Sequence, residues 1–332
     1  MNASAPDNIL SVTGLRVTFN TIEGPVEAVR GIGFNVKRGR TLAIVGESGS
    51  GKSVTSYAIL RLIQPPGRIT GGKILFRPKT GPEYDIAALS DGSEQLFKLR
   101  GGKIGMIFQE PMTALSPVHT VGNQLIEAVC LHRTKDKKQA RQIAADMLAK
   151  VGIPDPQRRL DQYPFEFSGG MRQRVVIAMA LVCRPEVLIA DEPTTALDVT
   201  VQAQILQLIN DLKREMNASV IFITHDLGVV AQVADEVVVM NHGLIVETGT
   251  TRQIFKSPYH PYTKRLLAAV PRFEADEAFL ERIRSARCED LPRGCRLTPP
   301  DDDWRTDAPR ELKTLPDGRS LLVWPDLESV DV

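Results

Sequence analysis

The segment "GESGSGKS" combines glycines, a lysine and hydroxyl residues at a spacing suited to holding phosphate. It fits the pattern G-x-x-x-x-G-K-S. Glycines let the backbone curl so that successive N–H groups point inward at phosphate oxygens. The lysine would contact the outer phosphates, and the last serine would ligate Mg²⁺. The predicted phosphate loop comprises Gly46, Glu47, Ser48, Gly49, Ser50, Gly51, Lys52 and Ser53.

Flanking segments decide between a phosphate site and a plain glycine-rich turn. The apolar run "TLAIV" precedes the loop and reads as a buried strand, and "SVTSYAILRLI" follows with a helical pattern. The positive end of such a helix would point at the same anion. A strand before and a helix after favour phosphate binding over a turn without a ligand.

A second candidate site lies in the segment "EVLIADEP", where the apolar run "VLIA" is followed by two carboxylates. Asp191 at the tip of this strand could hold the Mg²⁺ shell, and Glu192 could orient and deprotonate an attacking water. A solvated strand end is the alternative for two adjacent carboxylates. The preceding buried residues favour the catalytic interpretation.

The segment "FSGGMRQR" provides a third polar element, and its Ser168 lies 23 residues before Asp191. Ser168, Gly169 and Gly170 open an apparent helix, where a hydroxyl and backbone N–H groups could bind an anion. Taken alone, "SGG" is an ordinary helix cap. Its position before the carboxylate pair favours a role in the same chemistry.

These polar elements need a scaffold, and the apolar pattern predicts an α/β fold. Several β-branched runs are continuous rather than alternating, as in strands buried on both faces of a parallel sheet, and helical patterns lie between them. From His119 to about Arg159 the pattern is helical, without a convincing strand. From about Pro271, seven prolines and weak periodicity predict a loosely specified C-terminal extension.

Bulk composition excludes several classes of protein. The chain has 332 residues and a net charge of +1, so no basic field indicates nucleic acid as a partner. No apolar run is long enough to span a bilayer, and the N-terminus lacks a secretory pattern. Four scattered cysteines indicate a reducing, cytosolic compartment.

With these motifs in place, the sequence resembles the ATP-binding subunits of ABC transporters over roughly residues 8 to 270. The resemblance implies a P-loop NTPase core of the RecA-like kind with an antiparallel β subdomain, a helical subdomain and a C-terminal extension. It also implies that ATP is held between two cassettes, with each phosphate loop facing the partner's "SGG" segment. The expected domains are 1–255 for the nucleotide-binding domain, with the helical subdomain at about 110–172, and 256–332 for the extension.

The resemblance assigns further residues by their motifs. Gln109 in "IGMIFQEP" matches the glutamine loop, which senses Mg²⁺ and the membrane subunit, so it joins Ser53 and Asp191 as an expected metal contact. Asp198 in "TTALD" matches the dimer-contacting loop. His225 in "VIFITHD" matches the γ-phosphate histidine, and Phe19 matches an aromatic that stacks on adenine. Core packing for Phe19, a capped strand end for Gln109 and a buried histidine for His225 remain the alternatives.

The expected activity is therefore ATP hydrolysis, with Glu192 as the base and His225 and Gln109 as further catalytic residues. "SPYHPYTKRLLAAVP" and "QEPMTALSPVHTVGNQ" resemble the oligopeptide/dipeptide importer group. That group implies two integral membrane permeases, an extracytoplasmic solute-binding protein and a second ATPase, either a nonidentical paralogue or a second copy. It implies a peripheral position on the cytoplasmic face of the inner membrane. The alternatives are an importer of oligosaccharide or nickel and, less favoured, an exporter cassette, a non-transport ABC ATPase or a non-enzymatic scaffold.

Two departures from the group's pattern concern the cofactor and the membrane partner. Cys288 and Cys295 cannot complete a four-thiolate site, so ATP and Mg²⁺ are expected without an iron–sulfur cluster. Phe165 replaces the histidine usual in "YPHEFSGG". The other histidines outside "THD", including His260, receive no chemical role.

Overall fold

The continuous apolar runs form strands whose ends carry the predicted polar residues. The structure is a computed structural model that describes residues 7–110, 114–195, 197–270, 281, 285–286, 291, 295–299, 302–304, 306 and 308–325. Its internal contacts divide it into a first unit, Met1–Leu10, Asn35–Arg40 and Leu75–Phe222, and a second unit, Ser11–Phe34, Thr41–Ile74 and Ile223–Val332.

The first unit contains three neighbouring strands in the order β8–β7–β6. They are β6 (Ile104–Ile107), β7 (Val187–Asp191) and β8 (Ser219–Ile223), whose last residue belongs to the second unit. Every residue of the three strands is buried. β6 and β7 run parallel, with Ile104 opposite Val187. The expectation of parallel strands buried on both faces is confirmed for this pair.

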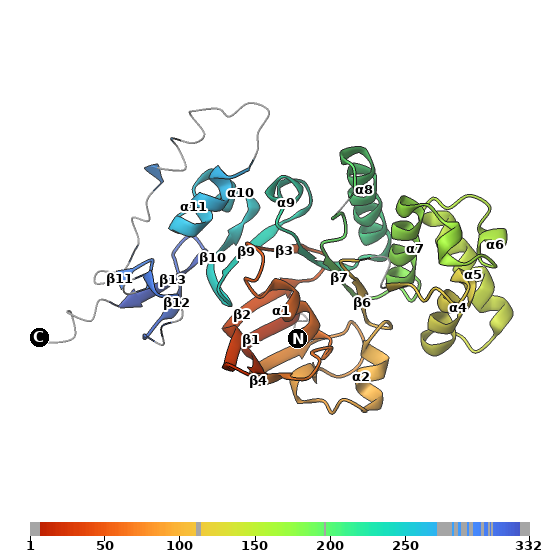
Figure 1. Cartoon of the computed structure of the whole chain (residues 1–332), viewed down its shortest axis with the longest axis horizontal. Helices are drawn as coiled ribbons and strands as arrows, with labels where there is room; N and C mark the ends of the chain where they lie inside the picture. The colour runs from red at the N-terminus through yellow and green to blue at the C-terminus, as the bar shows by residue number, and fades with distance from the viewer. Residues whose placement is uncertain are drawn as a thin grey trace, which may run out of the picture. The chain divides into compact units, whose positions relative to one another are not determined.

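Helices α4 to α7 follow β6 and gather in the yellow-green part of Figure 1. Thr120 caps α4 and Asp136 caps α5, each accepting a hydrogen bond from a backbone N–H of the first turn. The helical expectation between His119 and Arg159 is therefore confirmed. The helical elements of this stretch are α4 (Val121–His132), α5 (Lys137–Lys150), α6 (Pro156–Arg159), η2 (Pro164–Glu166) and α7 (Gly169–Leu181).

Short elements and one long helix complete the first unit. α8 (Val199–Met216) buries Ile205, Leu206, Ile209 and Leu212, which repeat at helical spacing along one face. The remaining elements are β5 (Tyr84–Asp85), η1 (Ile86–Ala88) and α2 (Glu94–Leu99).

The second unit is built on the strand order β11–β13–β10–β9–β3. β3 (Thr41–Val45) runs parallel to β9 (Glu236–Asn241), and β9 returns antiparallel as β10 (Leu244–Thr250). His242 and Gly243 both have positive φ, which suits the tight turn between β9 and β10. The helices α1 (Lys52–Ile59) and α9 (Leu227–Val233) belong to the same unit.

A second sheet has the strand order β2–β1–β4–β5. Its long strands are β1 (Asn8–Thr21), β2 (Gly24–Lys37) and β4 (Gly67–Phe76). The end of β4 pairs antiparallel with β5 inside the first unit, with Phe76 opposite Tyr84.

The C-terminal extension contains more structure than its sequence predicts. α10 (Thr251–Lys256) and α11 (Pro261–Ala268) lead to β11 (Cys295–Arg296), β12 (Glu311–Thr314) and β13 (Ser320–Pro325). β13 pairs with β10, and Leu322 and Trp324 lie in one core with residues of β3, β9 and α11. The expectation of a loosely specified fold is therefore wrong for β12 and β13, because β13 pairs with β10, which lies more than 70 residues earlier, and β12 pairs with β13.

Candidate functional site

The predicted phosphate loop turns directly out of the buried strand β3. Gly46, Gly49 and Gly51 have φ values of 155°, 79° and 98°, which favour glycine. A methyl group added to Gly46 would lie 2.2 Å from the Met240 carbonyl oxygen, and one added to Gly51 would lie 2.6 Å from the Ala28 carbonyl oxygen. The backbone geometry and the close packing both require glycine at these two positions.

Lys52 lies at the first position of α1, almost completely buried. Its ammonium donates hydrogen bonds to the carbonyl oxygens of Gly46 at 2.8 Å and Glu47 at 2.7 Å. It also lies 3.4 Å from the Ser50 hydroxyl. The lysine therefore reaches across the loop and holds a positive charge inside the curl of the backbone.

Two other predicted residues share the second unit with the loop. His225 is exposed and follows β8 directly, and Thr224 donates its backbone N–H to the Ile44 carbonyl oxygen of β3 at 3.4 Å. Phe19 is half-buried on β1, and its ring packs over Gly67, where any Cβ would collide with it. The structure thus places His225 beside a strand that leads into the loop.

In the first unit, polar side chains meet at the end of β7. Asp191, the last strand residue, is fully buried. Glu192 has a φ of 47°, a conformation that costs a non-glycine residue about 1–3 kcal/mol and recurs at functional sites. Its Oε2 atom accepts hydrogen bonds from the Gln109 amide at 3.1 Å and the Thr195 hydroxyl at 2.9 Å. The structure therefore brings Gln109 and Glu192 into direct contact.

The other two first-unit candidates act as helix caps. Ser168 precedes α7, and its hydroxyl accepts the Met171 N–H at 3.4 Å, while Asp198 accepts the Val201 N–H at 2.9 Å in front of α8. Ser168, Gly169 and Asp198 are exposed. The Ser168 capping bond involves the Met171 N–H and not those of Gly169 and Gly170, so an anion role for this segment stays a prediction.

Comparisons with known proteins agree with this layout. A family model described as "ABC transporter" matches residues 29–195, and one described as "Oligopeptide/dipeptide transporter, C-terminal region" matches residues 246–299. The dipeptide transport ATP-binding protein DppD of Bacillus subtilis (strain 168) is 56% identical over 278 residues, which cover 83% of this chain and 81% of DppD. The chain belongs to the ABC transporter family.

Further relatives support the same family and fold. The oligopeptide transport ATP-binding protein OppD of Bacillus subtilis (strain 168) is 55% identical over 80% of this chain and 73% of OppD. A solved dimeric ATP-binding cassette in a post-hydrolysis state, bound to ADP and Pi, has a TM-score of 0.63 at 27% identity, covering 73% of this chain and 99% of that chain. The predictions of an ABC cassette fold, of ATP binding and of ATPase activity in a transporter subunit are confirmed.

Sequence reasoning missed three residues, one that contacts the predicted phosphate loop and two that hold the start of α11. The Tyr262 hydroxyl accepts the Glu47 N–H at 2.9 Å, although Tyr262 lies in the C-terminal extension. His260 is buried and caps α11, and Glu247 is buried on β10. The available signal was local: a histidine followed by proline marks a helix start, but it does not identify the strand on which the helix packs.

The segment after Gln109 and the position of Phe165 have different degrees of exposure. Pro117 and Val118 are exposed, whereas Leu115 is buried. Phe165 is 68% exposed and stacks on Tyr163. Cys288 lies outside the described residues. No helix in the described part of the chain combines the length and apolar character needed to cross a membrane.

Proposed function

We propose that this ABC ATPase powers an importer for peptides or a related small solute. Its phosphate loop, residues 46–53, cradles the triphosphate of ATP, and Phe19 stacks on the adenine. The observation that carries the proposal is the loop itself, in which glycines at positive φ surround the buried ammonium of Lys52 between β3 and α1. The positive charge and the N-terminus of α1 suit a polyphosphate.

Hydrolysis uses the residues at the end of β7. Glu192 polarises the water that attacks the γ-phosphorus, and the Gln109 and Thr195 hydrogen bonds orient its carboxylate. His225 contacts the γ-phosphate, and Ser168, Gly169 and Gly170 of a second cassette complete the site. Asp198 contributes to the contact between cassettes. Lys52 neutralises charge on the transferring phosphoryl group.

Mg²⁺ would supply charge neutralisation at the phosphates when bound. Its proposed ligands are the Ser53 hydroxyl of the second unit and, in the first unit, the buried Asp191 carboxylate and the Gln109 amide oxygen. Oxygen donors of this kind are the ligands that Mg²⁺ prefers.

The cargo and the partners follow from the C-terminal region. Residues 246–299 match the oligopeptide/dipeptide transporter model, and the named relatives transport dipeptides and oligopeptides. The proposed assembly contains two membrane permeases, an extracytoplasmic solute-binding protein and a second ATPase. The chain sits peripherally on the cytoplasmic face of the inner membrane. The exposed Pro117, Val118 and Phe165 are the proposed contacts with the permeases.

A nucleotide titration and a trapping experiment test this function. Lys52→Ala should weaken binding of a fluorescent ATP analogue by about 10–100-fold, because a charged hydrogen-bond donor to the phosphates is lost. Glu192→Gln should keep ATP affinity but lower hydrolysis by about 10²–10⁴-fold and accumulate an ATP-bound dimer in light scattering. Unchanged affinity in the lysine variant, or parental turnover in the glutamine variant, would contradict the assignments.

The peptide cargo has its own test in the source cell. Cells that depend on this importer should resist a toxic dipeptide when Lys52→Ala replaces the parental chain. A parental chain that confers nickel or oligosaccharide uptake and leaves sensitivity to the toxic peptide unchanged would exclude the peptide cargo.

A further inference from the structure

The second residue of the phosphate loop is held by the C-terminal extension. The Glu47 N–H donates to the Tyr262 hydroxyl at 2.9 Å, across 215 positions of sequence. The carbonyl oxygen of Glu47 accepts from the Lys52 ammonium at 2.7 Å and from the Ser50 N–H at 3.2 Å. Both polar ends of this residue's backbone are therefore held, one by the loop and the other by α11.

Tyr262 is itself rigidly placed. Its side chain is 2% exposed and lies in the core with residues of β3, including Ala43 and Val45. The Arg265 guanidinium lies 5.8 Å from the centre of its ring. Because the ring has no room to move, its hydroxyl presents a preorganised acceptor to the loop.

The start of α11 is fixed by two buried polar side chains. His260 Nδ1 accepts the Tyr262 N–H at 3.1 Å, so the proton sits on Nε2, which donates to the Leu297 carbonyl oxygen at 2.7 Å. The Glu247 carboxylate accepts the N–H groups of Tyr259 at 2.9 Å and His260 at 3.1 Å. Backbone groups that a helix start leaves without intrahelical partners are thus satisfied by β10 and by the extension.

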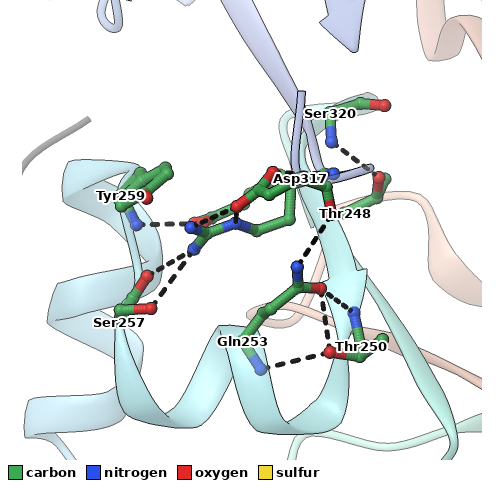
Figure 2. A network of polar contacts seen from close by, with 9 residues as sticks. Thr248, Thr250, Gln253, Ser257, Tyr259, Asp317 and Ser320 are labelled. Atoms are coloured by element: carbon green, nitrogen blue, oxygen red, sulfur yellow. Dashed lines mark hydrogen bonds and ion pairs between the residues drawn. The ribbon is translucent and has the colours of Figure 1, made fainter. Parts of the chain in front are cut away.

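The β12–β13 hairpin fastens the segment in front of α11, as Figure 2 shows. Ser320 donates its N–H to the Thr248 hydroxyl at 3.2 Å, and Gln253 donates its amide to the Asp317 carbonyl oxygen at 3.1 Å. The Arg319 guanidinium covers the Tyr259 ring at 3.6 Å and donates to the Ser257 carbonyl oxygen at 2.6 Å. A continuous set of contacts therefore runs from the hairpin to Tyr262 and on to Glu47.

We propose that Tyr262 is a positioning residue for the phosphate loop, so that the C-terminal extension sets the affinity of this cassette for ATP. The inference rests on the proposed phosphate-binding role of residues 46–53. A loop whose first peptide groups are fixed before ATP arrives loses less conformational freedom on binding. By thermodynamic linkage, ATP in turn strengthens the hold of the loop on α11.

Tyr262→Phe tests the proposal by removing only the hydroxyl. Loss of one neutral hydrogen bond predicts about 3–10-fold weaker binding of a fluorescent ATP analogue. The matched control is Tyr84→Phe, the same chemical change on β5 of the first unit, which should leave the affinity unchanged. A lower melting temperature with unaltered ATP affinity in Tyr262→Phe would show a purely structural role and overturn the proposal.

Hydrogen–deuterium exchange of the parental chain and of Tyr262→Phe gives a second measurement of the coupling. ATP should slow exchange of the α11 amides more than that of the α5 amides in the same sample, and this difference should disappear in Tyr262→Phe. Equal slowing in α11 and α5 would contradict the coupling.

Lys52→Ala distinguishes failure of the positioning role of Tyr262 from failure of the proposed phosphate-binding role of residues 46–53. If the parental chain binds ATP, Lys52→Ala weakens binding and Tyr262→Phe does not, the positioning role alone fails. If the parental chain and Lys52→Ala show the same ATP affinity, the proposed function of the loop fails first.

Discussion

The segments that follow β3 and β7 both come directly after a five-residue strand whose residues are all buried. Their conformations are determined by different kinds of contact. After β3 come glycines whose backbone groups and close packing shape the loop. After β7 comes Glu192, which adopts a positive φ without being glycine and is oriented by side chains from two exposed residues, Gln109 and Thr195.

This difference indicates that the loop after β3 is more rigid than the segment after β7. A site formed by backbone N–H groups is preorganised and tolerates no added side chain. A site formed by exposed side chains can rearrange at small cost, as a switchable catalytic group requires. Substitutions after β3 should therefore have large effects on binding, and substitutions around Glu192 should have graded effects on rate.

Gly51→Ala should produce the largest effect. The residue has a φ of 98°, and a methyl group would lie 2.6 Å from the Ala28 carbonyl oxygen. The combined strain and clash should destabilise the fold by roughly 2–4 kcal/mol and reduce ATP affinity at least about 100-fold. Thermal unfolding and nucleotide titration measure the two effects.

Gly169→Ala is the matched control, because nothing lies within 4 Å of its added methyl group and its φ is not positive. Its melting temperature should match or exceed that of the parent, since alanine favours a helix. If Gly51→Ala bound ATP with parental affinity, the prediction that the loop after β3 is more rigid than the segment after β7 would be wrong.

The support behind the phosphate loop should depend on pH through His260. Burial lowers the pKa of this histidine to about 4, so the folded chain binds the proton less readily than the unfolded chain, whose pKa is near 6.5. Its contribution is complete above about pH 6.5 and is lost as the pH falls toward 4, by roughly 3 kcal/mol in total. Urea unfolding at several pH values measures this slope.

Burial also raises the pKa of the Glu247 carboxyl, which contributes its own dependence of stability on pH. The comparison is therefore with His260→Asn, in which an amide oxygen can still accept the Tyr262 N–H but cannot titrate. The variant should show a shallower loss of stability between pH 6.5 and 4. Identical slopes for parent and variant would remove His260 as the cause.

Thr195→Ala tests how strongly the Glu192 carboxylate depends on one of its two hydrogen bonds. It removes the 2.9 Å hydrogen bond to Glu192 but leaves the Gln109 bond, so turnover should fall by only about 2–10-fold. Thr195→Ser keeps the hydroxyl and should retain the parental rate. A loss as large as that of Glu192→Gln would mean that the carboxylate depends on a rigid environment after all.

Ser168→Ala should lower stability only slightly. Its capping bond is long, at 3.4 Å, and exposed, so its loss should cost about 0.5 kcal/mol. Asp136→Ala removes the cap of α5 and should lower stability without changing ATPase activity. If Ser168→Ala also leaves ATPase activity intact, the segment is only a cap and its proposed role toward a partner's nucleotide is wrong.

Much of the scaffold could be predicted from local pattern. The runs 41–45 and 187–191 are continuous and apolar, and both are buried strands. Thr120, Asp136 and Ser168 begin helices because their side chains satisfy N–H groups only a few residues away. Gln109 and Glu192 were predicted individually, but their direct hydrogen bond depends on the parallel pairing of β6 with β7.

The sequence by itself determined the glycine-rich loop of residues 46–53, because the need for glycine at positive φ is local to these eight residues. Only the tertiary structure decided what stands behind that loop. The Glu47 N–H meets Tyr262, and Trp324 closes the same core, because the extension packs onto β3 and β10. Hydrophobic periodicity says which faces are buried but not which distant face covers them.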